Sequence, residues 1–375
     1  MRLQNTYYQE HVRTPCNNVM DAVGSTPLIG LNRYFAGSNA RVFAKLEALN
    51  PGGSAKDRPA KRMVEEAIAS GQISQNTTVV ESSSGNMGIG LAQACRYYGL
   101  KFICVVDPHA QQQNIKIITA LGGQIERVTQ KVEGSFLAAR WARVAAIVAD
   151  VDGAFWPNQY ANKHNPLAHQ SSTIREIDDA LDGEFDYLFV ATSSTGTASG
   201  CRDYLRSRDR KTKVVAVDAM GSALFGGESG TRLISGFGAG TIPPLAQGQK
   251  FDDVIRVSDL DCVVGCRRLA HQEALLVGGS SGGVLEAVRS YAHHLSGKTC
   301  VAILHDSGTR YLDTVFSDDW VKRKLGTTEE KLNRLVLANP QECFDLSSDS
   351  NDQRQSPSLA DAEMSLETTL SEIAE

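Results

Sequence analysis

The stretch RVFAKLEALNPGGSAKDRPAKRMVEEAIA, residues 41–69, decides the fold class, because it contains a strand pattern, a tight turn and a helix pattern in succession. The run from Arg41 to Glu47 predicts a strand, and Pro51-Gly52-Gly53 predicts the turn. Asp57 and the proline two residues later indicate the start of a helix. A strand, a turn and a helix in this order form the repeating unit of an α/β protein.

Lys56 lies at the junction between this turn and this helix. A side chain at such a junction points into the crevice at the edge of the sheet, where burial can keep an amine neutral. A neutral lysine can act as a nucleophile or form a Schiff base. The alternative is an exposed lysine that caps the helix, since most lysines are exposed.

The same alternation of strand and helix continues along the chain and predicts an α/β fold with two doubly wound, mainly parallel sheets. Helix patterns lie between the strands, including one from Glu133 to Asp150. Ligands of such sheets bind beyond the carboxyl ends of the strands. The further strands are expected at Thr77–Glu81, Lys101–Val106, Gln124–Val128, Asp186–Thr192, Lys213–Asp218 and Cys300–Leu304.

The composition is that of a globular protein, with 42% apolar and 22% charged residues in 375. The N-terminus has no apolar segment typical of a signal peptide, and no run is long enough to span a bilayer. The eight cysteines are scattered without the spacing of a metal site, so we expect reduced core residues in a cytoplasmic protein.

The net charge of −5 lies in the C-terminal tail, where residues 345–375 contain eight acidic residues and one arginine. This tail has little to bury, and we expect it to be disordered. The rest of the chain is nearly neutral, so no nucleic-acid partner is expected.

The loop Ser193-Ser194-Thr195-Gly196-Thr197 follows a strand and precedes a helix. Its hydroxyl groups, its glycine and the first amides of a helix suit a bound phosphate. It lacks the lysine of a nucleotide-binding P-loop. The alternative is a Ser/Thr cluster that only caps the helix.

Two further loops occupy similar positions. Ser82 to Asn86 suits a small carboxylate or a phenolic oxygen, with a plain helix cap as the alternative. Gly278 to Gly283 lets the backbone approach a flat ligand, and Ser280 can hydrogen-bond a ring nitrogen; the alternative is a flexible turn. An amine, a phosphate loop and this hydroxyl together describe a site for pyridoxal 5′-phosphate.

The motifs resemble the fold-type II pyridoxal-phosphate family, the cysteine synthase and cystathionine β-synthase group with a fold like that of the tryptophan synthase β subunit. The resemblance covers about residues 20–325. It rests on Gly24-Ser25-Thr26-Pro27-Leu28, Asn50 to Arg58, Ser83-Ser84-Gly85-Asn86, Ser194-Thr195-Gly196-Thr197 and Gly279-Ser280-Ser281-Gly282.

The resemblance implies roles for particular residues. Lys56 would be the Schiff-base lysine, Asn86 would contact the 3′-oxygen of the cofactor, Ser193 to Thr197 would hold the phosphate and Ser280 the pyridine nitrogen. It also implies a homodimer. Residues 1–46 and 158–340 would form a large cofactor-binding domain and residues 47–157 a small mobile substrate domain.

Departures from the usual family motifs point to a narrower branch. The substrate loop reads Ser83-Ser84-Gly85-Asn86-Met87, where cysteine synthases have Thr-Ser-Gly-Asn-Thr. With Glu81-Ser82, Trp156 to Tyr160 and Leu312-Asp313, the chain resembles the N-(2-amino-2-carboxyethyl)-L-glutamate synthases. That branch joins O-phospho-L-serine and L-glutamate and supplies 2,3-diaminopropionate for siderophores such as staphyloferrin B.

The branch implies that Ser83, Ser84, Gly85 and Met87 bind substrate, with Arg140 on the phosphate of phosphoserine and Tyr160 as a further contact. For Arg140 the alternative is a solvated helix residue, and for Tyr160 a half-buried aromatic. The alternative activity is that of a cysteine synthase, a cystathionine β-synthase-like enzyme or a serine dehydratase. More distant alternatives are a cofactor-binding regulator without turnover and a nicotinamide oxidoreductase.

Overall fold

The structure is a computed structural model that describes residues 15–338. Its strands form a larger sheet of six strands and a smaller sheet of three. In chain order the strands are β1 (Leu28–Gly30), β2 (Arg41–Leu46), β3 (Thr78–Glu81), β4 (Lys101–Val106), β5 (Gln124–Arg127), β6 (Tyr187–Ala191), β7 (Lys213–Ala219), β8 (Asp253–Val257) and β9 (Thr299–Leu304).

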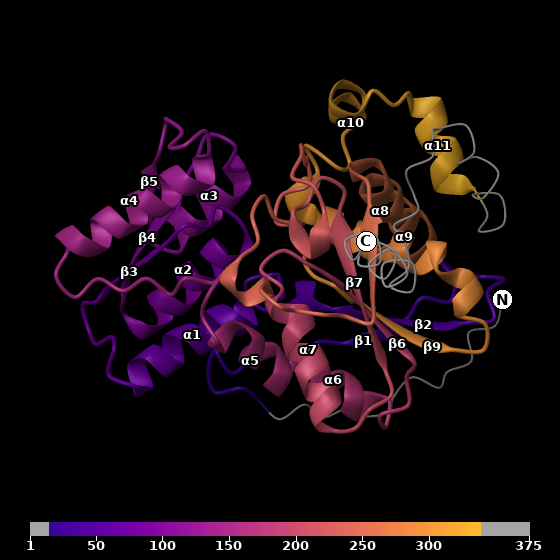
Figure 1. Ribbon diagram of the computed structural model, residues 1–375, viewed down its shortest axis with the longest axis horizontal. Coiled ribbons are helices and arrows are strands. Elements are labelled where there is room, and N and C mark those ends of the chain that lie inside the picture. Colours follow the sequence, from indigo (N-terminus) through magenta and orange to yellow (C-terminus); the bar gives the residue numbers. More distant parts are fainter. Residues whose placement is uncertain (1–14, 339–375) are drawn as a thin grey trace, which may run out of the picture.

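The larger sheet has the order β1-β2-β9-β6-β7-β8 and the smaller sheet the order β3-β4-β5. All neighbouring strands are parallel except β1, which is antiparallel to β2. Figure 1 shows the smaller sheet with α1 to α4 on one side of the molecule and the larger sheet on the other. The helices are α1 (Asp57–Ala69), α2 (Asn86–Tyr98), α3 (Gln112–Ala120), α4 (Phe136–Asp150), α5 (His164–Ser171), α6 (Thr173–Ala180), α7 (Gly196–Ser207), α8 (Asp259–Glu273), α9 (Gly279–Ser290), α10 (Asp318–Leu325) and α11 (Glu329–Leu337).

Both faces of the larger sheet are covered, because side chains alternate between the two faces along each strand. Phe189 on β6 packs in the core that contains α8 and α9, whereas Leu188 and Val190 pack in the core that contains α6 and α7. The smaller sheet is covered likewise. Its residue Val79 packs with α1, α2 and α3, and its neighbour Val80 packs with α4. The predicted doubly wound α/β class is therefore confirmed.

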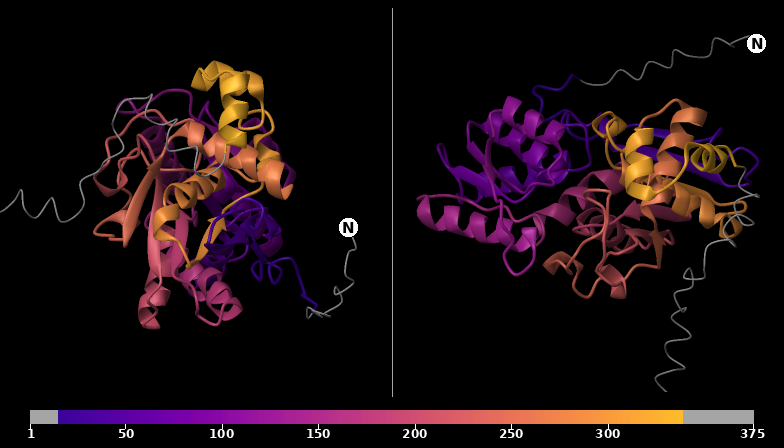
Figure 2. Two further views of the ribbon diagram at one scale, coloured as in Figure 1. Left: turned by 90° about the vertical axis from the view of Figure 1, so that its right-hand side faces the viewer. Right: turned by 90° about the horizontal axis from the view of Figure 1, so that it is seen from above.

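The two sheets meet where α1 packs against both α2 and α5. Figure 2, in the view from above, shows the two parts side by side. The strands divide between the sheets as the sequence-based domain limits would divide them, but those limits and the mobility of the smaller part stay predictions.

Several details differ from the sequence-based expectations, which also did not include β1, α5, α6, α10 and α11. The helix expected from Glu133 begins at Phe136, because Glu133 has a φ of 50° and the Ser135 hydroxyl accepts hydrogen bonds from the Leu137 and Ala138 amides. The strand β8 was not expected at all. It is an edge strand whose residues are mostly half-buried, so its sequence lacks a continuous apolar run.

Seven cysteines lie in the described residues, and all are free. Six of them are buried as expected, but Cys16 is exposed, so the prediction of a core residue is wrong there. Cys343 and the acidic tail 345–375 lie outside the described residues. Within residues 15–338, no helix is long and apolar enough to cross a membrane.

Candidate active site

Lys56 lies at the first turn of α1, next to the end of β9. The Ala55 amide donates a 2.8 Å hydrogen bond to the carbonyl of His305. The Lys56 amine has no hydrogen bond or ion pair with any residue that the structure describes. Burial lowers the pKa of Lys56, while the negative charges of Asp306 and Glu47 act in the opposite direction. The alternative of an exposed capping lysine is therefore wrong.

Asn86 is the first residue of α2. Two side chains from the segment that follows β9 hold it in place. Arg310, in the short 3-10 helix η5 (Gly308–Tyr311), donates to the Asn86 Oδ1 atom and to the carbonyl of Gly52. The Asn86 Nδ2 atom donates to Asp306 Oδ2 at 2.8 Å. These contacts fix the orientation of the amide and use one of its two N–H groups. The second N–H is left for a ligand.

The remaining residues of the predicted substrate loop have different surroundings. The Ser83 hydroxyl accepts a 3.3 Å bond from the Gly88 amide, and the Ser84 carbonyl accepts a 3.1 Å bond from Asn114. Gly85 is the residue before α2 and is partly exposed. Met87 is only 2% exposed and packs in the core with α1 and α3. Its predicted substrate contact stays a prediction, and the burial of its side chain is an observed structural role.

The predicted phosphate loop lies between β6 and α7. Thr195 has a φ of 65° and makes no side-chain cap to α7, which argues against the alternative of a mere capping cluster. Its Oγ1 atom is buried and has no hydrogen-bond partner in the described part of the chain. The first-turn amides of the twelve-residue helix α7 point into the same loop and favour an anion.

Two side chains of helix α5 contact this loop, and the sequence analysis did not identify them. Asn165 donates to the Ser194 hydroxyl at 3.2 Å, and a Cβ atom at Gly196 would overlap its side chain. His169 Nε2 lies 3.2 Å from Thr197 Oγ1. Burial lowers the pKa of His169 well below its usual range, so it is neutral. Neither residue belongs to a motif, and only the fold brings them to the loop.

The two serines at the start of α9 differ in their contacts. Ser281 is fully buried, and its hydroxyl accepts a 2.8 Å bond from the His305 amide. Ser280 is partly exposed, and its hydroxyl has no partner among residues 15–338. Ser280 is therefore the serine free to bind a ligand, in agreement with its predicted position in the site.

Arg140, on α4, is mostly buried and not solvated. Its side chain is 15% exposed, and its Nε atom lies 3.2 Å from Asp107 Oδ2, directly after β4. This close pair lacks hydrogen-bond geometry, since Nε has no hydrogen-bond partner within the described residues. The alternative of a solvated helix arginine is therefore wrong. The guanidinium is neutralised in part by a carboxylate, and any anionic ligand of Arg140 would have to compete with it.

Glu81, at the end of β3, lies close to this pair. Its carboxylate accepts hydrogen bonds from Trp156 Nε1 at 3.0 Å and from the Gln159 amide at 3.1 Å. Burial raises the pKa of Glu81, and Arg140 opposes that shift. Tyr160 is half-buried beside the same two charges, and the partial loss of solvent raises the pKa of its phenol. Arg140, Tyr160 and the Glu81 segment are thus brought together by the fold.

Two histidines connect Lys56 with the other loops. Burial lowers the pKa of both His169 and His305, and the charge of Lys56 adds to each shift. His169 contacts Thr197, and His305 donates to Ser281. The amine therefore lies close to both the phosphate loop and the start of α9.

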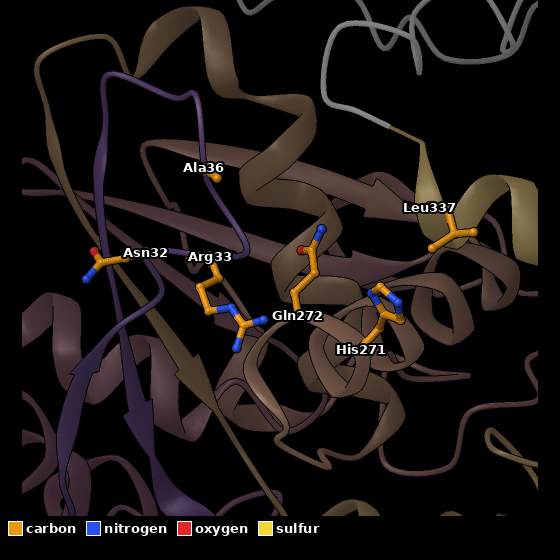
Figure 3. A pocket seen from close by; sticks show the side chains of 6 residues that line it. All are labelled: Asn32, Arg33, Ala36, His271, Gln272 and Leu337. Carbon is orange, nitrogen blue, oxygen red and sulfur yellow. The ribbon is translucent and has the colours of Figure 1, made fainter. Parts of the chain in front are cut away.

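A hollow elsewhere on the molecule contains none of the predicted site residues. Figure 3 shows it between the segment after β1, the end of α8 and the end of α11. Its volume is about 410 Å³, and it is lined by Asn32, Arg33, Ala36, His271, Gln272 and Leu337.

The free polar groups of the Lys56 site fit pyridoxal 5′-phosphate. The unpaired Thr195 hydroxyl and the first amides of α7 suit its phosphate. The unpaired amine of Lys56 suits its aldehyde carbon, and the free Ser280 hydroxyl suits its ring nitrogen. These groups lie on three separate loops that converge on one place.

Comparisons with known proteins agree with this fit. A model of the pyridoxal-phosphate dependent enzyme family matches residues 19–306. N-(2-amino-2-carboxyethyl)-L-glutamate synthase from Ralstonia nicotianae is 45% identical over 308 residues, which are 82% of this chain and 91% of that protein.

Solved structures of similar enzymes share the fold. An O-acetylserine dependent cystathionine β-synthase from Helicobacter pylori is 30% identical with a TM-score of 0.75, over 80% of this chain and 99% of that one. A mutant of O-ureido-L-serine synthase with bound O-ureido-L-serine is 30% identical with a TM-score of 0.76, over 84% of this chain and 100% of that one. A hydrogen sulfide-producing enzyme from Fusobacterium nucleatum is 31% identical with a TM-score of 0.75, over 80% of this chain and 100% of that one.

Proposed function

Because the chain belongs to the family of pyridoxal-phosphate dependent enzymes, we propose that it joins O-phospho-L-serine to L-glutamate. The amino nitrogen of glutamate replaces the phosphate on Cβ, and the products are N-(2-amino-2-carboxyethyl)-L-glutamate and phosphate. The observation that supports this choice of reaction is the likeness to the Ralstonia synthase, which spans most of both chains. The product is a precursor of L-2,3-diaminopropionate, and we place the enzyme in siderophore biosynthesis.

Pyridoxal 5′-phosphate, when bound, supplies an aldehyde carbon that condenses with amino groups and a ring that withdraws electrons from Cα. The residues proposed to hold it are Lys56, Asn86, the loop from Ser193 to Thr197, and Ser280. A neutral hydroxyl such as that of Ser280 leaves the ring nitrogen unprotonated. This weakens the electron sink and favours elimination at Cβ over transamination.

Lys56 moves the proton in this proposal. Its burial favours a neutral amine, which can take the proton from Cα of phosphoserine and return it to Cα of the product. Arg140 binds the phosphate, since a guanidinium matches a phosphate in charge and shape. The C–O bond to phosphate breaks before the amino nitrogen of glutamate forms its bond to Cβ.

Other predictions about the site and its setting remain part of the proposal. Ser83, Ser84, Gly85, Met87 and Tyr160 would surround the substrate. Residues 47–157 would form a small domain that moves against a large domain of residues 1–46 and 158–340. The enzyme would be a homodimer, as its family resemblance implies, and cytoplasmic, as its free cysteines favour.

Mass spectrometry of the reaction products tests the proposed reaction. Purified holoenzyme with phosphoserine and glutamate should give the joined amino acid, and Lys56→Ala should give none. Sulfide or homocysteine in place of glutamate tests the second candidate, a cysteine or cystathionine synthase, which the likeness to the cystathionine β-synthase from Helicobacter pylori favours. Faster formation of cysteine or cystathionine than of the glutamate product would establish that second candidate.

A further inference from the structure

Asp306, directly after β9, touches the parts of the chain that form the site. Its Oδ2 atom accepts hydrogen bonds from Asn86 Nδ2 at 2.8 Å and from the Tyr311 hydroxyl at 2.6 Å. Its carbonyl accepts a 3.1 Å bond from the Gly278 amide, next to the start of α9. It also forms an isolated bridge with Ser54, two residues before Lys56. No role in the proposed reaction has been assigned to this residue so far.

The second oxygen of this carboxylate is buried and unsatisfied. Asp306 is 1% exposed, and its Oδ1 atom has no hydrogen-bond partner within the described residues. It lies against Gly278, where a Cβ atom would overlap it. An unpaired buried carboxylate oxygen costs free energy. The fold nevertheless keeps the Asp306 Oδ1 atom unpaired, and the charge of Asp306 acts on the Lys56 amine. This arrangement indicates that the charge of Asp306 has a function.

The other negative charge that acts on Lys56 is already compensated. Glu47 accepts hydrogen bonds from Arg58 Nε at 2.7 Å and Nη2 at 2.8 Å, and from the Thr26 hydroxyl at 2.7 Å. The remaining titratable groups that act on the Lys56 charge or are acted on by it are the neutral ring of His169 and that of His305. Burial raises the pKa of Asp306, while its hydrogen bonds from Tyr311 and Asn86 and the charges of Arg310 and Lys56 act in the opposite direction. Asp306 is the carboxylate of the two that keeps an oxygen without a hydrogen bond among the described residues.

We propose that Asp306 is a positioning residue that directs the Asn86 amide toward the ligand and stabilises the Lys56 amine while that amine carries a proton. This inference rests on the proposed proton transfer by Lys56. The proton leaves Cα, makes the buried amine cationic, and later returns to Cα of the product, so no further reactant is needed. The nearby carboxylate stabilises the cation where partial burial weakens the screening by water. Tyr311 and Arg310 in turn hold Asp306 and Asn86 in place.

Two substitutions with opposite electrostatic effects test this inference in the holoenzyme. Asp306→Asn keeps the shape and an oxygen acceptor but removes the charge. Tyr311→Phe removes a hydrogen-bond donor and keeps the charge. Asp313→Asn, at an exposed position in the same segment, is the matched control. The measurement is a pH titration of the visible absorption of the bound cofactor, which reports the protonation of the nitrogen that joins it to Lys56.

Asp306→Asn should lower the midpoint of this titration by about one to two pH units, as expected for the loss of a unit charge at close range in protein surroundings. Tyr311→Phe should leave the midpoint where it is or move it to higher pH, and the control should match the wild type. A midpoint unchanged in Asp306→Asn would overturn the inference. If that variant does not fold, a midpoint lowered in Tyr311→Phe would overturn it.

A second measurement separates this inference from the choice of acceptor. Exchange of the Cα hydrogen of phosphoserine in D₂O, without glutamate, should slow at least tenfold in Asp306→Asn, because it needs only the proton transfer. Unchanged exchange would contradict the inference. If the titration and the exchange respond as expected but glutamate gives no product, the acceptor in the proposed function is wrong and the role of Asp306 stands.

Discussion

The pair of Arg140 and Asp107 gives a test of substrate choice with two opposite outcomes. We propose that Arg140 binds the phosphate of phosphoserine, but its Nε atom lies 3.2 Å from Asp107 Oδ2. A substrate phosphate must therefore draw the guanidinium away from a carboxylate. Arg140→Met should weaken phosphoserine binding, whereas Asp107→Asn should strengthen it, because the guanidinium then has no competing anion.

The magnitude follows from the burial of the pair. The two side chains are 15% and 11% exposed, so water screens their charges incompletely. Hydrogen bonds to charged groups are worth about 1.5–3 kcal/mol, which corresponds to a rise of roughly 10- to 150-fold in the KM for phosphoserine in Arg140→Met. In Asp107→Asn that KM should fall by roughly two- to tenfold. The Asn side chain keeps the oxygen that accepts the 2.8 Å hydrogen bond from the His109 amide.

The assay is phosphate release under steady-state conditions, with each substrate varied in turn. The KM for glutamate should change less than threefold in both variants. Arg143→Met is a matched control, since Arg143 lies on the same helix and pairs with Glu126 at 2.7 Å on the surface. Equal changes in both KM values for Arg140→Met, or a higher phosphoserine KM in Asp107→Asn, would refute the assignment of Arg140 to the phosphate.

Three further predictions concern the cofactor and stability. Thr195→Val should raise the dissociation constant of the cofactor by about tenfold, measured by fluorescence titration, because it removes one hydrogen bond to the phosphate; an unchanged constant would place the phosphate elsewhere. Arg58→Met should lower the free energy of unfolding by about 3–5 kcal/mol in urea, because it leaves Glu47 and Glu176 without their shared cation; a loss below 1 kcal/mol would contradict the importance of this network. Burial raises the pKa of Asp57 to about 7, so the folded protein binds more protons than the unfolded chain between about pH 4 and pH 7. Stability should therefore fall as the pH rises through this range, and Asp57→Asn should flatten that fall in urea unfolding; equal slopes in both proteins would contradict it.

The sequence predicted the residues that lie directly after strands or at the starts of helices. Lys56, Asn86, Thr195 and Ser280 all have such positions, because the carboxyl ends of parallel strands meet at one edge of a sheet. The same rule applied to β9 would have indicated Asp306, which follows its last residue by two positions. Asp306 belongs to none of the family motifs, so those motifs do not distinguish it from its neighbours.

The contacts that hold the site together could not be predicted in this way. Arg310 contacts Gly52 across 258 positions of the chain, and Asn86 across 224. His169 and Asn165 belong to a segment without a clear helical pattern, and they reach the phosphate loop only because α5 packs against α7. Such pairings depend on how the two sheets are placed, which local sequence does not encode.

The segment that contains Lys56 is held by ion pairs to residues that pack with the larger sheet. Two residues after Lys56, Arg58 binds Glu47 at 2.7 Å and Glu176 at 2.6 Å, and both of these partners belong to the part of the chain that packs with the larger sheet. Asn86, in contrast, starts a helix of the smaller sheet and reaches the larger one through Asp306 and Arg310. Lys56 and Asn86 both lie within residues 47–157, the proposed small domain, so a movement of that domain against the large one would have to change the contacts of Arg58 with Glu176 and of Asn86 with Asp306.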